Sequence, residues 1–156
     1  MQSRAERSIH SGLLMEEGGR IIQAEEGDDE IFVYRGGNQV VPRDVRRVRI
    51  DASVKSIPVG ALQHRRSLIY VEFHDGIERI EVWIFQGCVS LRRVKLLGVK
   101  VIRWAAFDGC SGLTDVEGNK LETIGSSAFQ NCTSLRSVGC LVLRTLKKGR
   151  SMVAVS

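Results

Sequence analysis

The stretch "IGSSAFQNCTSLRSV", residues 124–138, occurs twice more with small changes, as "IRWAAFDGCSGLTDV" at 102–116 and "IEVWIFQGCVSLRRV" at 80–94. A weaker copy begins one period earlier. The copies begin at Ile57, Ile80, Ile102 and Ile124, so the steps are 23, 22 and 22 residues. A period of this length predicts a solenoid, in which each repeat is one coil that buries its apolar side chains against its neighbours.

Several columns of the aligned copies are apolar throughout. Five residues after each isoleucine stand Leu62, Phe85, Phe107 and Phe129. Fourteen residues after it stand Val71, Val94, Val116 and Val138. The alternation of apolar and polar residues around each valine predicts a short strand with one face in the core. Val48 continues the valine column one period upstream.

The segment that precedes each strand has helical spacing. Ala128, Phe129 and Cys132 stand at i, i+1 and i+4, which places them on one side of a short turn of helix. Seven residues after each isoleucine stand His64, Gly87, Gly109 and Asn131, residue types that accept a positive φ. The expected fold class is therefore an α/β repeat, a solenoid with short strands and short helical turns.

The repeat resembles that of BspA-like leucine-rich repeat proteins, whose units have roughly the pattern I-G-x-x-A-F-x-x-C-x-S-L-x-x-V. The resemblance covers about residues 45 to 146 and implies protein binding or adhesion, with no catalytic residues to carry over. Val99 or Ile77 stands where other leucine-rich repeats have an asparagine, so no asparagine ladder is expected. Surface-exposed members of the family carry export signals, and no such signal is visible here.

The ends of the array are predicted to differ from its coils. Two β-rich runs surround Gly36-Gly37-Asn38, which indicates a hairpin, and we expect residues 31–44 to form an N-terminal hairpin cap. The acidic segment 1–30 has no clear period and is expected to be mostly disordered. The solenoid is expected over 45–146 and a basic tail over 147–156. The array stops half-way through a coil, so the chain is either naturally short or part of a longer repeat protein.

Composition limits the possible functions. The chain has 156 residues, of which 43% are hydrophobic and 6% aromatic, so it is globular but poorly suited to binding nucleic acid by base stacking. No apolar run is long enough to span a membrane, and the first thirty residues lack the apolar core of a secretory signal. A cytoplasmic location is therefore expected. The four cysteines, Cys88, Cys110, Cys132 and Cys140, are then expected to be reduced.

Candidate catalytic and metal sites are weak in this sequence. Cys88, Cys110 and Cys132 form one column, but they lack a paired C-x-x-C and are interpreted as buried fillers, part of a structural ladder with the leucine and phenylalanines. His74 and Asp75, with Asp51 one coil earlier, form the only cluster with acid–base chemistry, and no nucleophile or third ligand accompanies them. We therefore expect no enzyme activity, cofactor or metal.

The exposed positions of the strands favour binding. Arg47, Tyr70, Arg93 and Asp115 form one outward column, and arginine and tyrosine are enriched at protein interfaces. The column Lys55, Glu78, Lys100, Glu122 and Arg144 alternates in charge and is interpreted as a stacking aid. The net charge is +5, and residues 1–30 hold three arginines and eight acids, so the remainder carries +10. The preferred function is a non-enzymatic protein-binding scaffold. The alternative is electrostatic binding of nucleic acid or another polyanion through 42–50, 92–95 and 144–150.

Overall fold

The computed structural model describes residues 30–139 and three short strand segments, 16–17, 20–21 and 145–146. The chain divides into two compact units, residues 1–30 and 31–156. In the first unit β1 (Glu16–Glu17) pairs antiparallel with β2 (Arg20–Ile21). The rest of the segment predicted to be disordered, and the predicted basic tail 147–156, lie outside the described residues.

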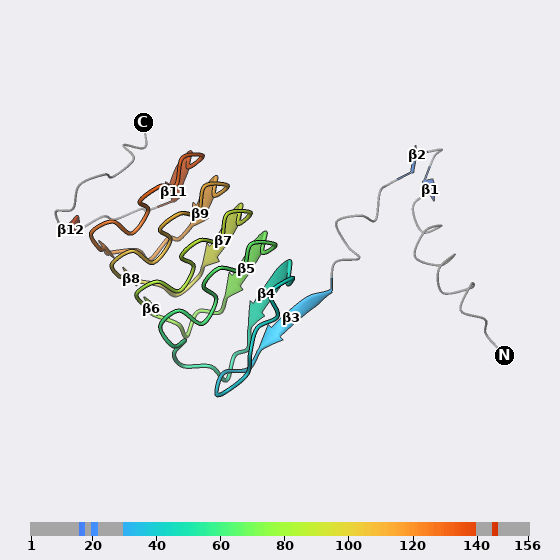
Figure 1. The fold of residues 1–156 in the computed structure, drawn as a ribbon, viewed down its shortest axis with the longest axis horizontal. Coiled ribbons are helices and arrows are strands. Elements are labelled where there is room, and N and C mark those ends of the chain that lie inside the picture. Colours follow the sequence, from blue (N-terminus) through green and yellow to red (C-terminus); the bar gives the residue numbers. More distant parts are fainter. Residues whose placement is uncertain (1–15, 18–19, 22–29, 140–144, 147–156) are drawn as a thin grey trace. The chain divides into compact units, whose positions relative to one another are not determined.

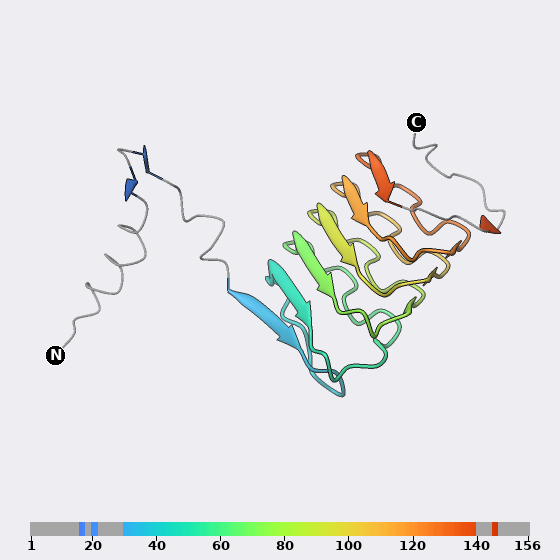
Figure 2. The same cartoon turned by 180° about the vertical axis from the view of Figure 1, so that it is seen from behind.

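The second unit is a stack of coils with two parallel sheets (Figures 1 and 2). The larger sheet has six strands, β3 (Ile31–Tyr34), β4 (Arg47–Ile50), β5 (Tyr70–Phe73), β7 (Arg93–Leu96), β9 (Asp115–Glu117) and β11 (Ser137–Gly139). The smaller sheet has four, β6 (Arg79–Ile80), β8 (Val101–Ile102), β10 (Thr123–Ile124) and β12 (Thr145–Leu146). Every strand pair in both sheets is parallel.

The strand register reproduces the columns of the aligned sequence. Val71 pairs with Val48 on one side and Val94 on the other, and the column continues through Val116 to Val138. In the smaller sheet Ile102 pairs with Ile80 and Ile124. The predicted repeat solenoid is therefore confirmed, and each apolar column of the sequence is a continuous stack of side chains.

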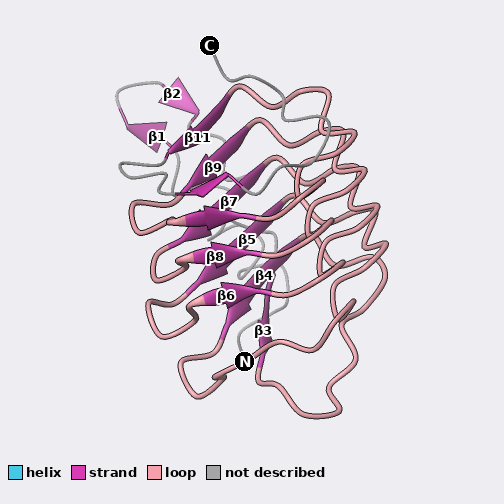
Figure 3. Ribbon diagram, turned by 90° about the vertical axis from the view of Figure 1, so that its left-hand side faces the viewer, coloured by secondary structure: helices cyan, strands magenta, loops and turns pink. Residues whose placement is uncertain are grey.

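The predicted helical turns are wrong. Figure 3 shows strands and turns but no helix in the described part of the chain. The wall opposite the larger sheet is held by hydrogen bonds from one coil to the next. The N–H of Phe85 donates to the Ala106 carbonyl and the N–H of Gly87 to that of Asp108, both at 2.8 Å. In an α-helix these N–H groups would bond within their own coil, and the contact with the next coil would be lost.

Two left-handed residues in each coil produce this geometry. The predicted column is confirmed, with φ values of 56° at His64, 72° at Gly87, 75° at Gly109 and 59° at Asn131. A second column, four residues earlier, was not predicted. It has φ values of 69° at Gly60, 57° at Trp83, 50° at Ala105 and 55° at Ser127. Each left-handed residue reverses the local twist, so neighbouring N–H groups point alternately into their own coil and toward the next one.

The N-terminal hairpin is also wrong. Strand β3 pairs parallel with β4, from Ile31 opposite Arg47 to Tyr34 opposite Ile50, and residues 35–46 contain no second strand. The Gln39 side chain accepts a hydrogen bond from the Arg35 N–H at 2.6 Å and donates to the Val33 carbonyl at 3.3 Å, which closes 35–39 into a loop. A parallel β3 extends the existing sheet in register and buries Tyr34, which is 1% exposed.

Phenylalanines from successive coils form a stack in the core. The Phe107 ring lies between the rings of Phe85 and Phe129, with centroids 5.0 and 5.2 Å apart and planes within 13° and 11° of parallel. The Phe73 ring meets Phe85 edge-on at 5.9 Å. Leu62 occupies the same column in the first full coil and is fully buried, as are Phe85 and Phe107. The stack fills the space between the two walls of the solenoid.

Replacing Phe107 with alanine is expected to lower the free energy of unfolding by about 3–5 kcal/mol, because it removes a core phenylalanine and leaves a cavity between two rings. Urea denaturation followed by circular dichroism measures this change. Val40→Ala is the control, since Val40 is 79% exposed and should change stability little. Equal stability of the two variants would contradict the stacking register.

Candidate interaction surface

The predicted binding column lies at the starts of five strands. Register places Tyr70 between Arg47 and Arg93, then Arg93 beside Asp115 and Asp115 beside Ser137. The next residue of each strand is the valine of the core column. Because successive side chains of a strand point to opposite faces, this column lies on the outer face of the larger sheet. The structure thus brings the four predicted residues together.

Tyr70 and Arg47 are in contact on this face. The guanidinium carbon of Arg47 lies 5.5 Å from the centroid of the Tyr70 ring, within cation–π distance. Both side chains are half-buried, whereas Arg93 on the other side of Tyr70 is exposed. Burial, together with the nearby Glu72, raises the pKa of Tyr70. The ring is therefore a neutral, partly fixed platform that can donate a hydrogen bond.

Asp115 ends the column with a fixed negative charge. Its carboxylate accepts hydrogen bonds from the hydroxyls of Thr114 at 2.8 Å and Ser137 at 2.9 Å. These two bonds, in that order, lower the pKa of Asp115 below its ordinary value of 3.8. The stabilisation they provide is therefore fully present well above pH 3.8 and is lost as pH falls through the lowered pKa of Asp115. At neutral pH the carboxylate is ionised and held in one orientation.

Arginines dominate the rest of this face. Exposed Arg46, Arg92 and Arg136 occupy the position just before Arg47, Arg93 and Ser137. On the same face, Arg49 Nε lies 3.3 Å from a carboxylate oxygen of Glu72 across the β4–β5 pair. The predicted basic stretches 42–50 and 92–95 therefore contribute to one sheet face, and 144–150 lies outside the described residues except for the two positions of β12. The face is positive, with carboxylates interspersed.

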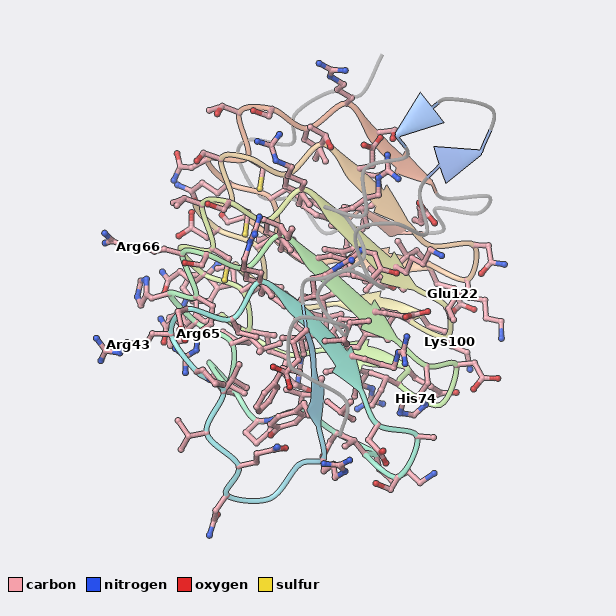
Figure 4. All side chains as sticks on the ribbon, turned by 90° about the vertical axis from the view of Figure 1, so that its right-hand side faces the viewer. Arg43, Arg65, Arg66, His74, Lys100 and Glu122 are labelled. Carbon is pink, nitrogen blue, oxygen red and sulfur yellow. The ribbon has the colours of Figure 1, made fainter. Side chains whose placement is uncertain are left out.

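The second charged column lies beside the smaller sheet and is partly paired with itself. The Lys100 Nζ donates to a carboxylate oxygen of Glu78 at 2.7 Å. This bond lowers the pKa of Glu78 and raises that of Lys100. Figure 4 shows Lys100 and Glu122 on the same side of the solenoid, opposite Arg43, Arg65 and Arg66. The predicted end of the column, Arg144, lies outside the described residues.

The His74 cluster has no free coordinating nitrogen. The Gly76 N–H donates to His74 Nδ1 at 3.0 Å, so Nε2 must carry the ring proton and donates it to the Val54 carbonyl at 2.9 Å. Asp51 accepts bonds from the N–H and hydroxyl of Ser53, which lower its pKa. Among the described residues no group of three or more His, Cys, Asp or Glu side chains is arranged to hold a metal ion. The cluster therefore links turns of neighbouring coils.

The cysteine column has a hydrogen-bonding role that the sequence did not reveal. Each thiol lies 3.0–3.1 Å from a carbonyl of the preceding coil, Cys88 from Leu62, Cys110 from Phe85 and Cys132 from Phe107. All three are free and buried. Burial is the main cause that raises the pKa of Cys88, to about 12. The carbonyls of Phe85 and Phe107 also accept the backbone N–H of Cys88 and Cys110, so there the thiol of the next coil adds a second, weak donor. Cys140 lies outside the described residues.

An exposed tryptophan pair was not among the predicted site residues. Trp83 and Trp104 are 37% and 48% exposed, and their ring centroids lie 5.2 Å apart with planes at 61°. The sequence does contain a signal for this pair, because each tryptophan stands in a column whose other members are smaller residues. Trp83 replaces glycine, alanine or serine, and Trp104 replaces valine or serine.

With the geometry of the repeat established, its family can be stated. Residues 43–144 match the BspA type leucine rich repeat region in six copies. Because this match covers well over half of the chain, the protein belongs to that family, as the resemblance in its repeats indicated. The repeat fold of this family is generally a binding scaffold, and its members typically bind proteins. No helix among the described residues has the length and apolar character of a membrane span.

Three bacterial leucine-rich repeat structures are similar to this chain. A leucine rich cell surface protein from Faecalibacterium prausnitzii A2-165 is 21% identical, with 65% of this chain and 34% of that one covered and a TM-score of 0.48. The T. pallidum leucine rich repeat protein is 24% identical, with 69% and 62% covered and a TM-score of 0.48. A leucine-rich repeat protein from Bacteroides ovatus ATCC 8483 is 19% identical, with 70% and 30% covered and a TM-score of 0.38.

The chain thus spans less than two thirds of the length of each of these three proteins. No curated protein sequence matches it.

The three column cysteines are expected to react slowly with a thiol reagent in the native protein at pH 8. Their burial excludes the reagent, and a pKa of about 12 at Cys88 leaves almost no thiolate there. Kinetics with Ellman's reagent on Cys140→Ser, which removes the fourth thiol, measure this directly, with the denatured protein as reference. Equal rates in the two states, or stoichiometric zinc in the purified protein, would contradict the assignment.

Lys100→Glu is expected to lower the melting temperature modestly, because it replaces a bonded pair with a third carboxylate between Glu78 and Glu122. The loss should shrink as salt rises, since exposed charges are screened. Arg66→Glu makes the same charge change at an exposed residue on the opposite side (Figure 4). A salt-independent loss, or equal losses in both variants, would show that the charged column does not assist stacking.

Proposed function

We propose that this protein is a non-enzymatic scaffold that binds another protein through the outer face of the larger sheet. The observation that carries the proposal is the Arg47–Tyr70 contact, which holds an aromatic ring at the surface between two arginines. Residues of these types contribute most of the binding energy in many interfaces. Because the Tyr70 ring is already restrained, less side-chain entropy is lost when a partner covers it.

A protein partner fits this face better than a nucleic acid. Glu72, Asp115 and Glu117 lie among the arginines in neighbouring strands and would repel phosphates. Tyr70 is the single aromatic residue of the face in the described strands β4 to β11, so stacking of successive bases has no platform. A protein surface that offers both carboxylates and amines can match the mixed pattern. The positive excess favours a partner segment that is mainly acidic.

The absence of enzyme activity is part of the same proposal. Both nitrogens of His74 are engaged in hydrogen bonds to backbone groups, and the column thiols are buried. Neither group is therefore placed to accept a proton from a substrate or to attack one.

Tyr70→Ala is expected to weaken binding to the partner at least tenfold, because truncation of a central interface tyrosine typically costs about 2 kcal/mol or more. The partner is first captured on the immobilised 156-residue chain from an extract of cells that express this protein. It is then purified and titrated against the wild type and the variants by calorimetry. Glu122→Ala, on the other side of the solenoid, is the matched control and should bind as the wild type does.

The polyanion alternative is tested with the same proteins. Binding of heparin or duplex DNA should be weak at physiological salt and should disappear steeply as salt rises. The proposal would be overturned if duplex DNA bound tightly at physiological salt while Tyr70→Ala left every measured affinity unchanged.

A further inference from the structure

Trp83 occupies a backbone position that suits small residues. Its φ is 57°, in the left-handed region, and the same column holds Gly60, Ala105 and Ser127 in the other coils. A bulky side chain in this region is unusual, because its Cβ crowds the backbone. The turn itself therefore gives no reason for tryptophan, and backbone strain of this kind is more common at functional sites than elsewhere.

Neighbouring side chains extend the tryptophan pair into an apolar strip. Val59, 57% exposed, and half-buried Val82 occupy the same column as Trp104 in the two preceding coils. The strip, defined as Val59, Val82, Trp83 and Trp104, therefore crosses three successive coils. Contiguous exposed apolar surface of this kind marks interaction sites on soluble proteins. A few partly exposed side chains offer far less than the roughly 800 Å² per partner of a stable dimer, so the strip suits a short peptide.

Charge next to the strip is already neutralised. Arg103, adjacent to Trp104, donates to a carboxylate oxygen of Glu81 at 3.0 Å, and Glu81 lies two residues from Trp83. A ligand on the strip would meet a paired cation and anion. This differs from the arginine-rich outer face of the larger sheet and favours an uncharged ligand over an acidic or a basic one.

The spacing of the strip matches a polyproline II helix. Neighbouring coils are separated by the interstrand distance, about 4.8 Å, so Val59 and Trp104 are about 10 Å apart along the stack. A polyproline II helix repeats every three residues, over roughly 9.3 Å. Residues i and i+3 of such a segment point to the same side and can therefore contact the two ends of the strip.

We propose that the Val59–Val82–Trp83–Trp104 strip binds a proline-rich segment of a partner protein that lies along the solenoid axis. Proline rings pack against indole faces, and the indole N–H can donate to the unpaired carbonyls of the polyproline backbone. A proline-rich segment already has the polyproline II conformation before it binds, so it loses little conformational entropy on binding. This site is separate from the sheet face that contains Tyr70.

Tryptophan fluorescence tests the proposal. The chain has two tryptophans and both lie in the strip, so all of its tryptophan emission reports on this site. Titration of the full chain with decaproline should shift the emission to the blue and saturate. A Gly-Ser peptide of the same length should cause no shift. Fluorescein-labelled decaproline, followed by anisotropy, gives an affinity that can also be measured for variants without tryptophan.

Each tryptophan is replaced by the residue that stands at the same repeat position in a neighbouring coil, so that the variants should keep the fold. Trp83→Ala copies Ala105, and Trp104→Val copies Val82. The double variant should retain the circular dichroism of the wild type and weaken decaproline binding by roughly tenfold or more. Tyr70→Ala should bind decaproline as the wild type does, which separates this site from the proposed sheet-face site. The inference is overturned if decaproline gives no saturable change, if the folded double variant binds it equally well, or if only an apolar helical peptide binds.

Discussion

Hydrogen bonds between the backbones of neighbouring coils, on the wall opposite the larger sheet, are the constraint on which the rest of the structure depends. The N–H groups of Phe107 and Gly109 reach the carbonyls of Ala128 and Gln130 in the following coil at 2.8 Å, as those of Phe85 and Gly87 reach the carbonyls of Ala106 and Asp108. Each bond joins residues about one repeat apart, so the repeat length is held near 22 residues. Once the coils are in this register, the phenylalanine rings stack, the thiols reach their carbonyls and the valines of the strands align.

The same register organises the surface. A residue at a given position of one coil has the corresponding residues of other coils as its neighbours, so charged and aromatic side chains collect in columns. The outer face of the larger sheet combines Arg47, Tyr70 and Arg93 in three adjacent strands. The tryptophan strip lies in other columns and has its nearby charges paired. Two surfaces of different chemistry can thus coexist on a small solenoid, and together they would let it bind two partner segments.

Much of the fold could be predicted because it is encoded locally and repeated. The valine register and the left-handed residues at His64, Gly87, Gly109 and Asn131 follow from a single period and from residue type. The helical turns were wrong because the helical spacing of Ala128, Phe129 and Cys132 also fits a non-helical turn, and in the corresponding turns the N–H groups of Phe85 and Phe107 bond to the next coil. Whether the segment forms a helical turn or bonds to the next coil depends on an acceptor carbonyl about one repeat away in the sequence. The hairpin was wrong for the same reason, since glycines at 36 and 37 turn the chain but do not select its strand partner.

Hydrogen exchange at single amides tests the central claim most directly. If the wall is held by bonds between coils, the amides of Phe107 and Gly109 should be protected to a degree similar to that of the strand amide of Val94, although neither residue belongs to a helix or strand. The amide of Val40, an exposed residue of the loop after β3, should exchange rapidly by comparison. NMR-detected exchange of the full chain gives all four rates in one experiment. Exchange of Phe107 and Gly109 at the rate of Val40 would contradict the account.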